Sequence, residues 1–600
     1  YITTHSIQKA VVVGAGFIGL EMAENLHHTG AQVSIVERLN QVMPPIDLTM
    51  AAMVESHLVS KGVSLYLEKS VVAFNRKDNQ IEIQLDDGST LLADIVILSI
   101  GVRPATQLAE QAGLKIGETK GIFVNEYLQT SDENIYAVGD AIEFPHPITG
   151  KPWMNFLANP ANRQGRIVAD NMVFGNKIPY EGAIGTAIAK VFDITVGSTG
   201  LAAKQLIRNE MPYLSSTTHS NSHAEYYPNA SSLTIKLTFH PKTGTLYGAQ
   251  CVGVEGVDKR IDQIALLIKK GGTVHDLIRL EHTYAPPFSS AKDPIAIAGY
   301  VANNIIINKM PVVYWRDIKN DGNKKYTLLD VRTIDEFELD AIPGSIHIPL
   351  EELRKRINEI PEGKPIVVFC RAGLRGYLAQ QILMGRGIKE VYNLLGGYKV
   401  YISMVAQRNY ICQNEPKVKS QHSEKPIMVE MIKDSIKVDA CGLQCPGPIL
   451  KLKNKMDEVN IGDVIEIKST DPGFARDAEA WSNMTGNKLI SNTSEKGIYT
   501  AVIEKSASKR ITTEVSHGGK GKTLILFSQD LDKALATFVL ANGAAATGEK
   551  VTIFFTFWGL NVIKKVKKPK VKKDIFGKAF GMMLPSSSLK LKLSKLNMFG

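Results

Sequence analysis

The sequence feature that most constrains the fold is a glycine pattern directly after a short apolar run. Lys9 to Val13 predicts a buried strand, and Gly14-Ala15-Gly16-Phe17-Ile18-Gly19 follows it and leads into apolar residues at helical spacing. A second apolar run, Val33 to Val36, ends at Glu37. Glycines at this spacing between a strand and a helix, with an acid at the end of the next strand, predict a dinucleotide-binding βαβ unit.

Each glycine of the motif has its own role in such a unit. Gly14 allows the tight turn, Gly16 lets a pyrophosphate approach the backbone, and Gly19 lets the helix pack on the strand. Glu37 can accept hydrogen bonds from both ribose hydroxyls and would repel a 2′-phosphate, so we expect NADH rather than NADPH. The positively charged Arg38, the next residue, weakens this expected preference for NADH. The alternative for the motif is a structural glycine-rich turn.

A lone cysteine occupies a second loop between a strand and a helix. The apolar run Ile366 to Phe369 predicts a strand, Cys370 ends it, and a helical pattern starts near Tyr377. Backbone N–H groups in such a loop, together with Arg371 and Arg375, favour a thiolate or an anionic persulfide. We therefore predict a reactive cysteine. The alternative is a buried core cysteine.

Two further cysteines stand four residues apart. Cys445 precedes a proline and a helical apolar pattern, so it is expected at a helix start, where the helix dipole stabilises a thiolate. Cys441 and Cys445 could instead be two zinc ligands, but no second Cys/His pair stands near them. We therefore expect no metal.

Composition limits the remaining possibilities. Six hundred residues suggest three to five domains. No apolar run is long enough for a membrane span, and no signal peptide pattern opens the chain, so no membrane partner is expected. Five cysteines are sparse, which favours a reducing, cytoplasmic compartment. Much of the net charge of +10 lies in Lys564 to Lys573; nucleic acid is not an expected partner of this run, which lacks aromatic residues.

The first half of the chain carries motifs in a recognisable order. After the glycine motif come an alternating run with an Asp87-Gly88 turn, an apolar strand Ile95 to Leu98 that leads to Gly101, and a strand expected to end in Gly139-Asp140 before a helix. In this order the segments resemble two-dinucleotide flavoprotein disulfide reductases. The resemblance implies FAD, and it implies that Asp140 contacts the flavin ribityl chain. The alternative role of Asp140 is a helix N-cap.

A proline-rich loop narrows this resemblance. The stretch Tyr284 to Pro294 looks like the interface loop of coenzyme A-disulfide reductases, in which two tyrosines reach across a homodimer to the active site. By motif these tyrosines are Tyr284 and Tyr226. The family's single redox cysteine and first glycine motif would precede Tyr1, so we expect a fragment, truncated at both ends, with half a flavin site. Cys251 lies in an apolar, strand-like context and is expected in the core.

The Cys370 loop belongs to a second resemblance. With Asp330-Val331-Arg332, Ile342-Pro343-Gly344 and Leu395-Gly396-Gly397-Tyr398 it resembles a rhodanese domain. That family transfers sulfane sulfur through a cysteine persulfide, which implies this role for Cys370.

Two small domains are expected after it. The Cys445 segment, with Thr470-Asp471-Pro472-Gly473-Phe474 and Trp481, resembles TusA/SirA-like sulfur carriers, whose persulfide would be on Cys445. Strands at Leu524 to Phe527 and Val551 to Phe555, joined by an Ala-rich helix, look like part of a DsrE-like domain.

The expected fold class is multidomain α/β. The expected segments are 1–115, a Rossmann-type NAD(H)-binding domain; 116–180, the C-terminal part of an FAD-binding domain; 181–310, an α+β dimerisation domain; 326–412, a rhodanese-like α/β domain; 427–505, a small TusA-like α/β sandwich; and 521–600, a truncated DsrE-like domain. Residues 311–325, 413–425 and 506–521 are expected to be linkers.

These resemblances imply a flavoenzyme that passes electrons from NADH (or NADPH) through FAD to coenzyme A disulfide or persulfide, coupled to sulfur transfer. The expected partners are small thiols, disulfides and persulfides, a second copy of the chain, and sulfur-acceptor proteins. Two other classes remain open: a sulfurtransferase and carrier whose flavoprotein half is a scaffold, and a redox-sensing binding protein.

Overall fold

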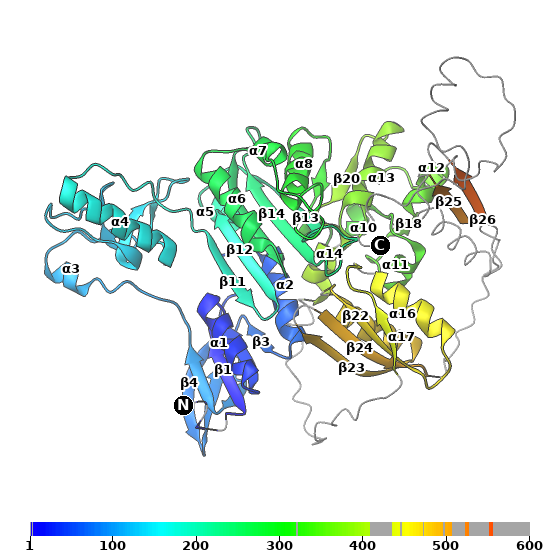
Figure 1. The fold of residues 1–600 in the computed structure, drawn as a ribbon, viewed down its shortest axis with the longest axis horizontal. Coiled ribbons are helices and arrows are strands. Elements are labelled where there is room, and N and C mark those ends of the chain that lie inside the picture. The colour runs from blue at the N-terminus through cyan, green and yellow to red at the C-terminus, as the bar shows by residue number, and fades with distance from the viewer. Residues whose placement is uncertain are drawn as a thin grey trace, which may run out of the picture. The chain divides into compact units, whose positions relative to one another are not determined.

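The computed structural model describes residues 2, 4–5, 7–319, 322–407, 435–443, 447–471, 473–495, 498–506, 522–526 and 551–555 (Figure 1). The chain divides into two compact units, Tyr1–Ser508 and Lys509–Gly600. Each unit is described separately below.

The first sheet is the parallel sheet that the glycine motif predicts. Its strand order is β3-β2-β1-β7, and the central strand β1 is buried along nearly all of its length because two strands flank it and helices cover the sheet. The hairpin predicted around Asp87-Gly88 is present as β5 and β6 of an antiparallel sheet. The elements are β1 (Lys9–Val13), α1 (Phe17–His28), β2 (Gln32–Glu37), α2 (Leu48–Ser60), β3 (Ser64–Leu67), β4 (Val71–Lys77), β5 (Gln80–Leu85), β6 (Thr90–Ala93) and β7 (Ile95–Leu98).

The prediction for the segment before Gly139 is wrong. No strand runs into Gly139-Asp140 and no α-helix follows directly: after a turn in which the Asp132 carboxylate accepts the N–H of Asn134 at 2.8 Å, Tyr136 forms only an isolated antiparallel bridge with Gln129. Gly139 opens a single 3₁₀ turn, and a strand follows it. The elements are α3 (Gln107–Gln111), β8 (Ile122–Phe123), η1 (Gly139–Ala141), β9 (Ile142–Pro145), β10 (Pro152–Trp153) and α4 (Ala158–Phe174).

An antiparallel five-stranded sheet follows, in the order β11-β12-β15-β14-β13. The alternating residues predicted on β14 are buried in a core shared with α6, α7 and α8, and Figure 1 shows α6 along the sheet. Cys251 on β15 is fully buried, as expected. The elements are β11 (Ala187–Val191), β12 (Ile194–Gly200), α5 (Ala203–Arg208), β13 (Leu214–Asn221), β14 (Ser232–Phe239), β15 (Leu246–Gly253), α6 (Val257–Lys269), α7 (Val274–Arg279) and α8 (Pro294–Ile306).

The third large sheet is parallel, in the order β16-β20-β19-β17-β18. The expected linker 311–325 is wrong: it supplies the edge strand β16 and two short helices, because Val313 and Ile318 are apolar enough to be buried in the core of this sheet. The elements are β16 (Val312–Val313), α9 (Trp315–Ile318), α10 (Gly322–Lys325), β17 (Thr327–Asp330), α11 (Ile334–Leu339), β18 (Ile346–His347), α12 (Leu350–Arg356), η2 (Ile357–Glu359), β19 (Ile366–Phe369), α13 (Leu374–Gly385), β20 (Val391–Leu394), α14 (Gly397–Ile402) and η3 (Ser403–Gln407).

A four-stranded sheet with two helices completes the first unit, in the order β21-β22-β24-β23. Its core contains Phe474 and Trp481, two residues of the sulfur-carrier resemblance. The elements are β21 (Ile436–Asp439), α16 (Gly447–Glu458), β22 (Val464–Ser469), α17 (Phe474–Thr485), β23 (Lys488–Glu495) and β24 (Ile498–Glu504).

In the second unit the described residues are two strands, β25 (Lys522–Leu526) and β26 (Val551–Phe555), which pair in parallel as a βαβ unit requires. The predicted helix between them, the lysine run and the expected linker 413–425 lie outside the described residues.

Candidate active sites: a nucleotide loop and a cysteine loop

The glycines of the first loop have the geometry that a dinucleotide-binding turn needs. Gly14 has φ +101°, and a Cβ on it would lie 2.1 Å from the carbonyl oxygen of Ser99. A Cβ on Gly19 would lie 2.0 Å from the carbonyl oxygen of Gly14. A Cβ on Gly16 would meet nothing within 4 Å. Gly14 and Gly19 therefore permit close packing, whereas the space at Gly16 is open to a ligand.

The end of β2 brings a carboxylate to this loop. Glu37 is buried; its Oε2 accepts the N–H of Ala15 at 2.7 Å, and its Oε1 accepts the N–H of Leu39 at 2.8 Å. Helix α1 begins after Gly16 without a side-chain cap, so its first N–H groups are available to a phosphate. The loop, the helix N-terminus and Glu37 together fit a nicotinamide dinucleotide.

Gly101, Gly139 and Asp140 are the remaining predicted cofactor-binding residues, and Asp140 is the one expected at the flavin ribityl chain. Gly101 follows β7 with φ +105°, in open space. Gly139 has φ +81° and donates its N–H to Oε1 of Gln164 at 2.7 Å, which fixes the 3₁₀ turn to α4. Asp140 is exposed, and its side chain caps no helix. A solvent-facing carboxylate on a fixed turn fits contact with the hydroxyls of a ribityl chain.

The cysteine loop lies between β19 and α13, which begins three residues before the predicted start. The Sγ atom of Cys370 is buried and accepts the N–H of Gly373 at 3.1 Å. The carbonyl of Cys370 accepts the N–H of Tyr398 at 2.8 Å, and the carbonyl of Arg371 accepts that of Lys399 at 3.0 Å. The Leu395–Tyr398 motif thus holds the cysteine loop in place. One backbone N–H, rather than several, reaches the sulfur among the described residues.

The two arginines of the loop each face a carboxylate. Arg375 and Glu336 form a bidentate pair at 2.6 and 2.7 Å, and Arg371 lies 3.7 Å from Asp471 of the four-stranded domain. Burial alone would raise the pKa of Glu336, but the hydrogen bonds and charge of Arg375 and the Thr333 N–H outweigh it and lower that pKa. Much of the positive charge predicted beside Cys370 is therefore compensated locally.

The structure brings the two predicted tyrosines together. The hydroxyls of Tyr226 and Tyr284 lie 3.3 Å apart, although the residues are 58 positions apart in sequence. Both side chains are exposed, at 76% and 50%. The hydrogen bond between Tyr226 and Tyr284 raises the pKa of Tyr226. An exposed pair of phenols is suited to donate hydrogen bonds to a ligand that reaches it from outside.

The remaining cysteines differ from Cys370. Burial raises the pKa of the Cys251 thiol well above its usual range, which fits an inert core residue. Burial and a hydrogen bond to Asp439 raise the pKa of Cys441 to about 12. Cys445 lies outside the described residues, and α16 begins two positions after it. Within the described part of the chain, no group of three His, Cys, Asp or Glu residues is placed to hold a metal.

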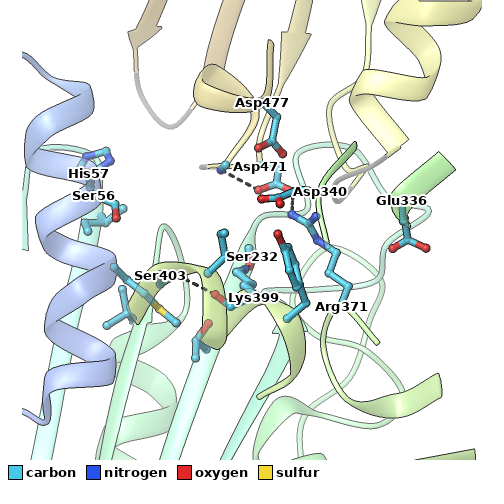
Figure 2. A pocket seen from close by; sticks show the side chains of 18 of the residues that line it. Ser56, His57, Ser232, Glu336, Asp340, Arg371, Lys399, Ser403, Asp471 and Asp477 are labelled. Carbon is cyan, nitrogen blue, oxygen red and sulfur yellow. Dashed lines mark hydrogen bonds and ion pairs between the residues drawn. The ribbon is translucent and has the colours of Figure 1, made fainter. Parts of the chain in front are cut away.

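A cavity of about 210 Å³ lies beside the cysteine loop, where α2, the antiparallel sheet, the Cys370 domain and the four-stranded domain meet (Figure 2). Arg371 lines it, whereas Cys370 does not. His57 lines it from α2, with Nδ1 3.2 Å from the Tyr499 hydroxyl and Nε2 without a partner. Burial and the charge of Lys61 lower the pKa of His57 to about 4, so this imidazole is neutral at pH 7.

Of the helices in the described ranges, none combines the length and apolar character that crossing a bilayer requires.

The parallel nucleotide sheet, the antiparallel sheet and the paired tyrosines define a pyridine nucleotide-disulphide oxidoreductase, and the chain belongs to this family. The family model for pyridine nucleotide-disulphide oxidoreductase matches residues 2–165, and that for its dimerisation domain matches 186–294. A rhodanese-like domain matches 314–404, sulfurtransferase TusA matches 436–505, and the DsrE/DsrF/DrsH-like family matches 519–600. The family uses flavin and NAD(P)H, and its dimerisation domain indicates a homodimer.

Three proteins that are similar to this chain have more specific names. Reduced CoADR-RHD of Bacillus anthracis is 46% identical, with a TM-score of 0.66, over 68% of this chain and 73% of that chain. The NAD-dependent persulfide reductase from A. fulgidus is 38% identical, with a TM-score of 0.63, over 67% of this chain and 73% of that one. The CoA-dependent NAD(P)H sulfur oxidoreductase of Pyrococcus furiosus is 33% identical over 50% of this chain and 67% of its own length.

Sequence reasoning missed two residues that the structure places at these sites: Glu336 and His57. Glu336 had a signal, because Thr333-x-x-Glu336 is a capping-box pattern, but that pattern predicts a helix start and not a pair with Arg375. His57 had no signal.

Proposed function

We propose that this protein is an NADH-dependent reductase of coenzyme A disulfide or coenzyme A persulfide, coupled to sulfane-sulfur transfer through Cys370. The open glycine loop with Glu37 supports NADH, and the Asp140 turn supports FAD. The tyrosine pair and the printed names of the relatives support a coenzyme A-linked disulfide or persulfide. Cys445 would carry sulfur onward to an acceptor protein, in a homodimer in the reducing cytoplasm.

The observation that carries the coupling is the attachment of the rhodanese-like domain to the dimerisation sheet. His219 Nε2 on β13 lies 3.2 Å from the carbonyl oxygen of Gly396, and Lys399 Nζ donates to Ser232 Oγ at 2.9 Å. Gly396 belongs to the turn that holds the Cys370 loop. Burial, followed by the charge of Lys399, lowers the pKa of His219 well below its usual range, so this contact is made by a neutral ring at pH 7. These contacts support the proposed coupling, because they hold the Cys370 loop against the antiparallel sheet.

The test is an anaerobic assay of the protein as its natural full-length chain, supplied with FAD. With coenzyme A disulfide, one NADH and one proton should yield two coenzyme A thiols and NAD⁺. Because Glu37 supplies a ribose contact and repels a 2′-phosphate, Kd for NADPH should exceed that for NADH by about tenfold or more. Thiosulfate-to-cyanide transfer should proceed in the same preparation. Sulfur transfer to cyanide without NADH oxidation would instead show that the flavoprotein half is a scaffold. Absence of both activities would leave the third class, a redox-sensing binding protein.

A further inference from the structure

Tyr226 lies on the loop of residues 222–231 between β13 and β14, the tyrosine loop. The reductase holds the base of this loop. The N–H of Ser222 donates to the carbonyl oxygen of Ser231 at 2.8 Å, and Nη2 of the buried Arg260 donates to the Ser222 carbonyl oxygen at 2.9 Å. Tyr226 lies in the middle of the loop, away from these bonds, and its side chain is 76% exposed.

The second tyrosine of the pair belongs to a segment that the reductase holds by itself. Five positions after Tyr284, Ser289 Oγ donates to the carboxylate of Asp293 at 2.6 Å, and Asp293 forms a buried ion pair with an arginine of α6. The N–H of Ala224 donates to the carbonyl oxygen of Pro286 at 3.3 Å and joins this segment to the tyrosine loop. The position of Tyr284 is therefore set by a buried charge network of the dimerisation domain.

The tyrosine loop has an additional contact, from the TusA-like domain of residues 436–505. Thr470 of that domain is buried, and its Oγ1 donates to the carbonyl oxygen of Ala230 at 2.9 Å. The same Oγ1 accepts the N–H of Gly442 at 2.9 Å, so the hydroxyl proton is directed toward Ala230. Ala230 lies four positions after Tyr226 in the tyrosine loop.

The TusA-like domain also packs against the residue before Tyr226. Gly442 has φ +81°, and a Cβ built on it would lie 3.4 Å from the carbonyl oxygen of Glu225. This distance is that of an ordinary van der Waals contact, so the turn at Gly442 lies directly against the tyrosine loop. Contacts from one domain thus reach the loop on both sides of Tyr226, at Glu225 and at Ala230.

We propose that Thr470 of the TusA-like domain is a positioning residue for the reduction of coenzyme A disulfide, because it braces the tyrosine loop and keeps the phenol of Tyr226 beside that of Tyr284. The proposal rests on the proposed function, in which the tyrosine pair binds the coenzyme A compound. It makes the TusA-like domain part of the substrate site of the reductase, whatever sulfur that domain carries.

The effect of this brace falls on substrate binding. A loop that moves freely must be ordered when the substrate binds, and the cost of ordering it lowers the affinity. NADH binds at a loop in another domain, at residues 14–19, so transfer of electrons from NADH to the flavin does not depend on Thr470. Loss of the brace should therefore raise KM for the disulfide and leave kcat nearly unchanged.

The test compares Thr470→Val with wild type in the natural full-length chain supplied with FAD. Valine keeps the shape of threonine and removes the hydroxyl between Gly442 and Ala230. KM for coenzyme A disulfide should rise roughly three- to tenfold, the effect of one lost hydrogen bond, while kcat changes by less than about twofold. Thr470→Ala also lacks the hydroxyl and should show the same rise. NADH-dependent reduction of ferricyanide, which needs the flavin but not the tyrosine pair, should be unchanged.

Three further variants separate positioning from a general loss of structure. Thr470→Ser keeps the hydroxyl and should restore the wild-type KM. Thr485→Val is the matched control, because Thr485 donates to the carbonyl oxygen of Trp481 within the TusA-like domain at 2.8 Å, and it should leave KM unchanged. In a Tyr226→Phe background, Thr470→Val should add little to KM, because the phenol hydroxyl that Thr470 positions is already absent.

Equal KM values for Thr470→Val and wild type would overturn the inference. So would an equal rise in Thr485→Val, or a full additional rise in the Tyr226→Phe background. Each of these results leaves the proposed function intact, because the wild type still reduces coenzyme A disulfide. If the wild type oxidises no NADH with coenzyme A disulfide, the proposed function fails and the inference fails with it.

Discussion

The nucleotide loop and the cysteine loop share one plan, a buried parallel strand that turns through glycines into a helix, but they use backbone N–H groups differently. In the nucleotide loop the first N–H groups of α1 have no side-chain cap and remain available to an external anion. In the cysteine loop the N–H of Gly373, the residue before α13, is already donated to Cys370 Sγ at 3.1 Å. The nucleotide loop is therefore suited to bind an external anion, whereas the cysteine loop uses its N–H group to hold the sulfur of Cys370.

The two loops also differ in where their support lies in the sequence. The nucleotide loop is supported by its own glycines and by Glu37 on the next strand. The cysteine loop is held by residues far from it in the sequence. Gly397 packs closely on it, because a Cβ there would lie 2.6 Å from the carbonyl oxygen of Cys370. Glu336 pairs with Arg375, and Asp471 lies against Arg371. A loop that is held by residues near it in the sequence can be recognised from a motif. A loop that is held by residues far away in the sequence depends on the domains that carry those residues.

The largest expected effect comes from removing the sulfur. Cys370→Ser should lower thiosulfate-to-cyanide transfer by at least about a thousandfold, because the hydroxyl cannot form a persulfide, and the free energy of unfolding should change little. Transfer is measured as thiocyanate, and NADH affinity by calorimetric titration should be unchanged. Cys441→Ser is the control and should retain transfer, since that thiol stays protonated. Undiminished thiocyanate formation by Cys370→Ser would refute the assignment of the nucleophile.

The next effect tests the local support of the nucleotide loop. Gly19→Ala places a methyl group 2.0 Å from the Gly14 carbonyl oxygen, which is backbone and cannot turn aside. Helix α1 must move away from β1, so the free energy of unfolding should fall by about 1–3 kcal/mol. The displaced N–H groups should weaken NADH binding about tenfold or more.

Gly385→Ala is the matched control for this variant, because Gly385 lies in α13 and its Cβ would meet nothing within 4 Å. It should retain wild-type affinity and gain slightly in helix stability. Both variants are compared by thermal unfolding and by titration with NADH. Wild-type affinity in Gly19→Ala would show that the loop binds the cofactor without the close helix–strand contact.

The same contrast between local and distant support explains what could be predicted from the sequence. The parallel nucleotide sheet, the Asp87-Gly88 hairpin and the strand before Cys370 follow from local patterns and are confirmed. The Tyr226–Tyr284 pair came from family resemblance, since no spacing rule joins residues 58 positions apart. The prediction of a linker at 311–325 was wrong because the two valines of β16 are too short a run to show the alternation that predicts a strand.

The carrier-domain contacts lay beyond sequence reasoning for a related reason. Thr470 reaches Ala230 across 240 positions, and nothing in either local pattern marks the pair. The strand predicted before Gly139 failed because the apolar run pairs only through one isolated bridge, between Tyr136 and Gln129, and an isolated bridge cannot be distinguished from a strand by its apolar pattern.

The smallest expected effect tests the distant support of the cysteine loop. Glu336→Gln breaks a bidentate pair in which the carboxylate is buried, leaving Arg375 beside Cys370 with its charge uncompensated. The free energy of unfolding at pH 7 should fall by about 1–2 kcal/mol, while sulfur transfer changes only severalfold. Because the pKa of Glu336 is lowered in the folded state, its contribution is fully present above its ordinary value of 4.5 and is lost as pH falls through the folded value.

The variant and the wild type should therefore approach each other in stability only in acid, as chemical unfolding between pH 7 and pH 3 would show. Glu359→Gln is the matched control, since Glu359 forms a bidentate pair with Arg356 that is exposed to water. Its removal should leave the unfolding transition unchanged within error, because solvent and salt screen an exposed pair. An equal loss in the two variants, or a gap between wild type and Glu336→Gln that persists at pH 3, would mean that burial of the pair does not stabilise the cysteine loop.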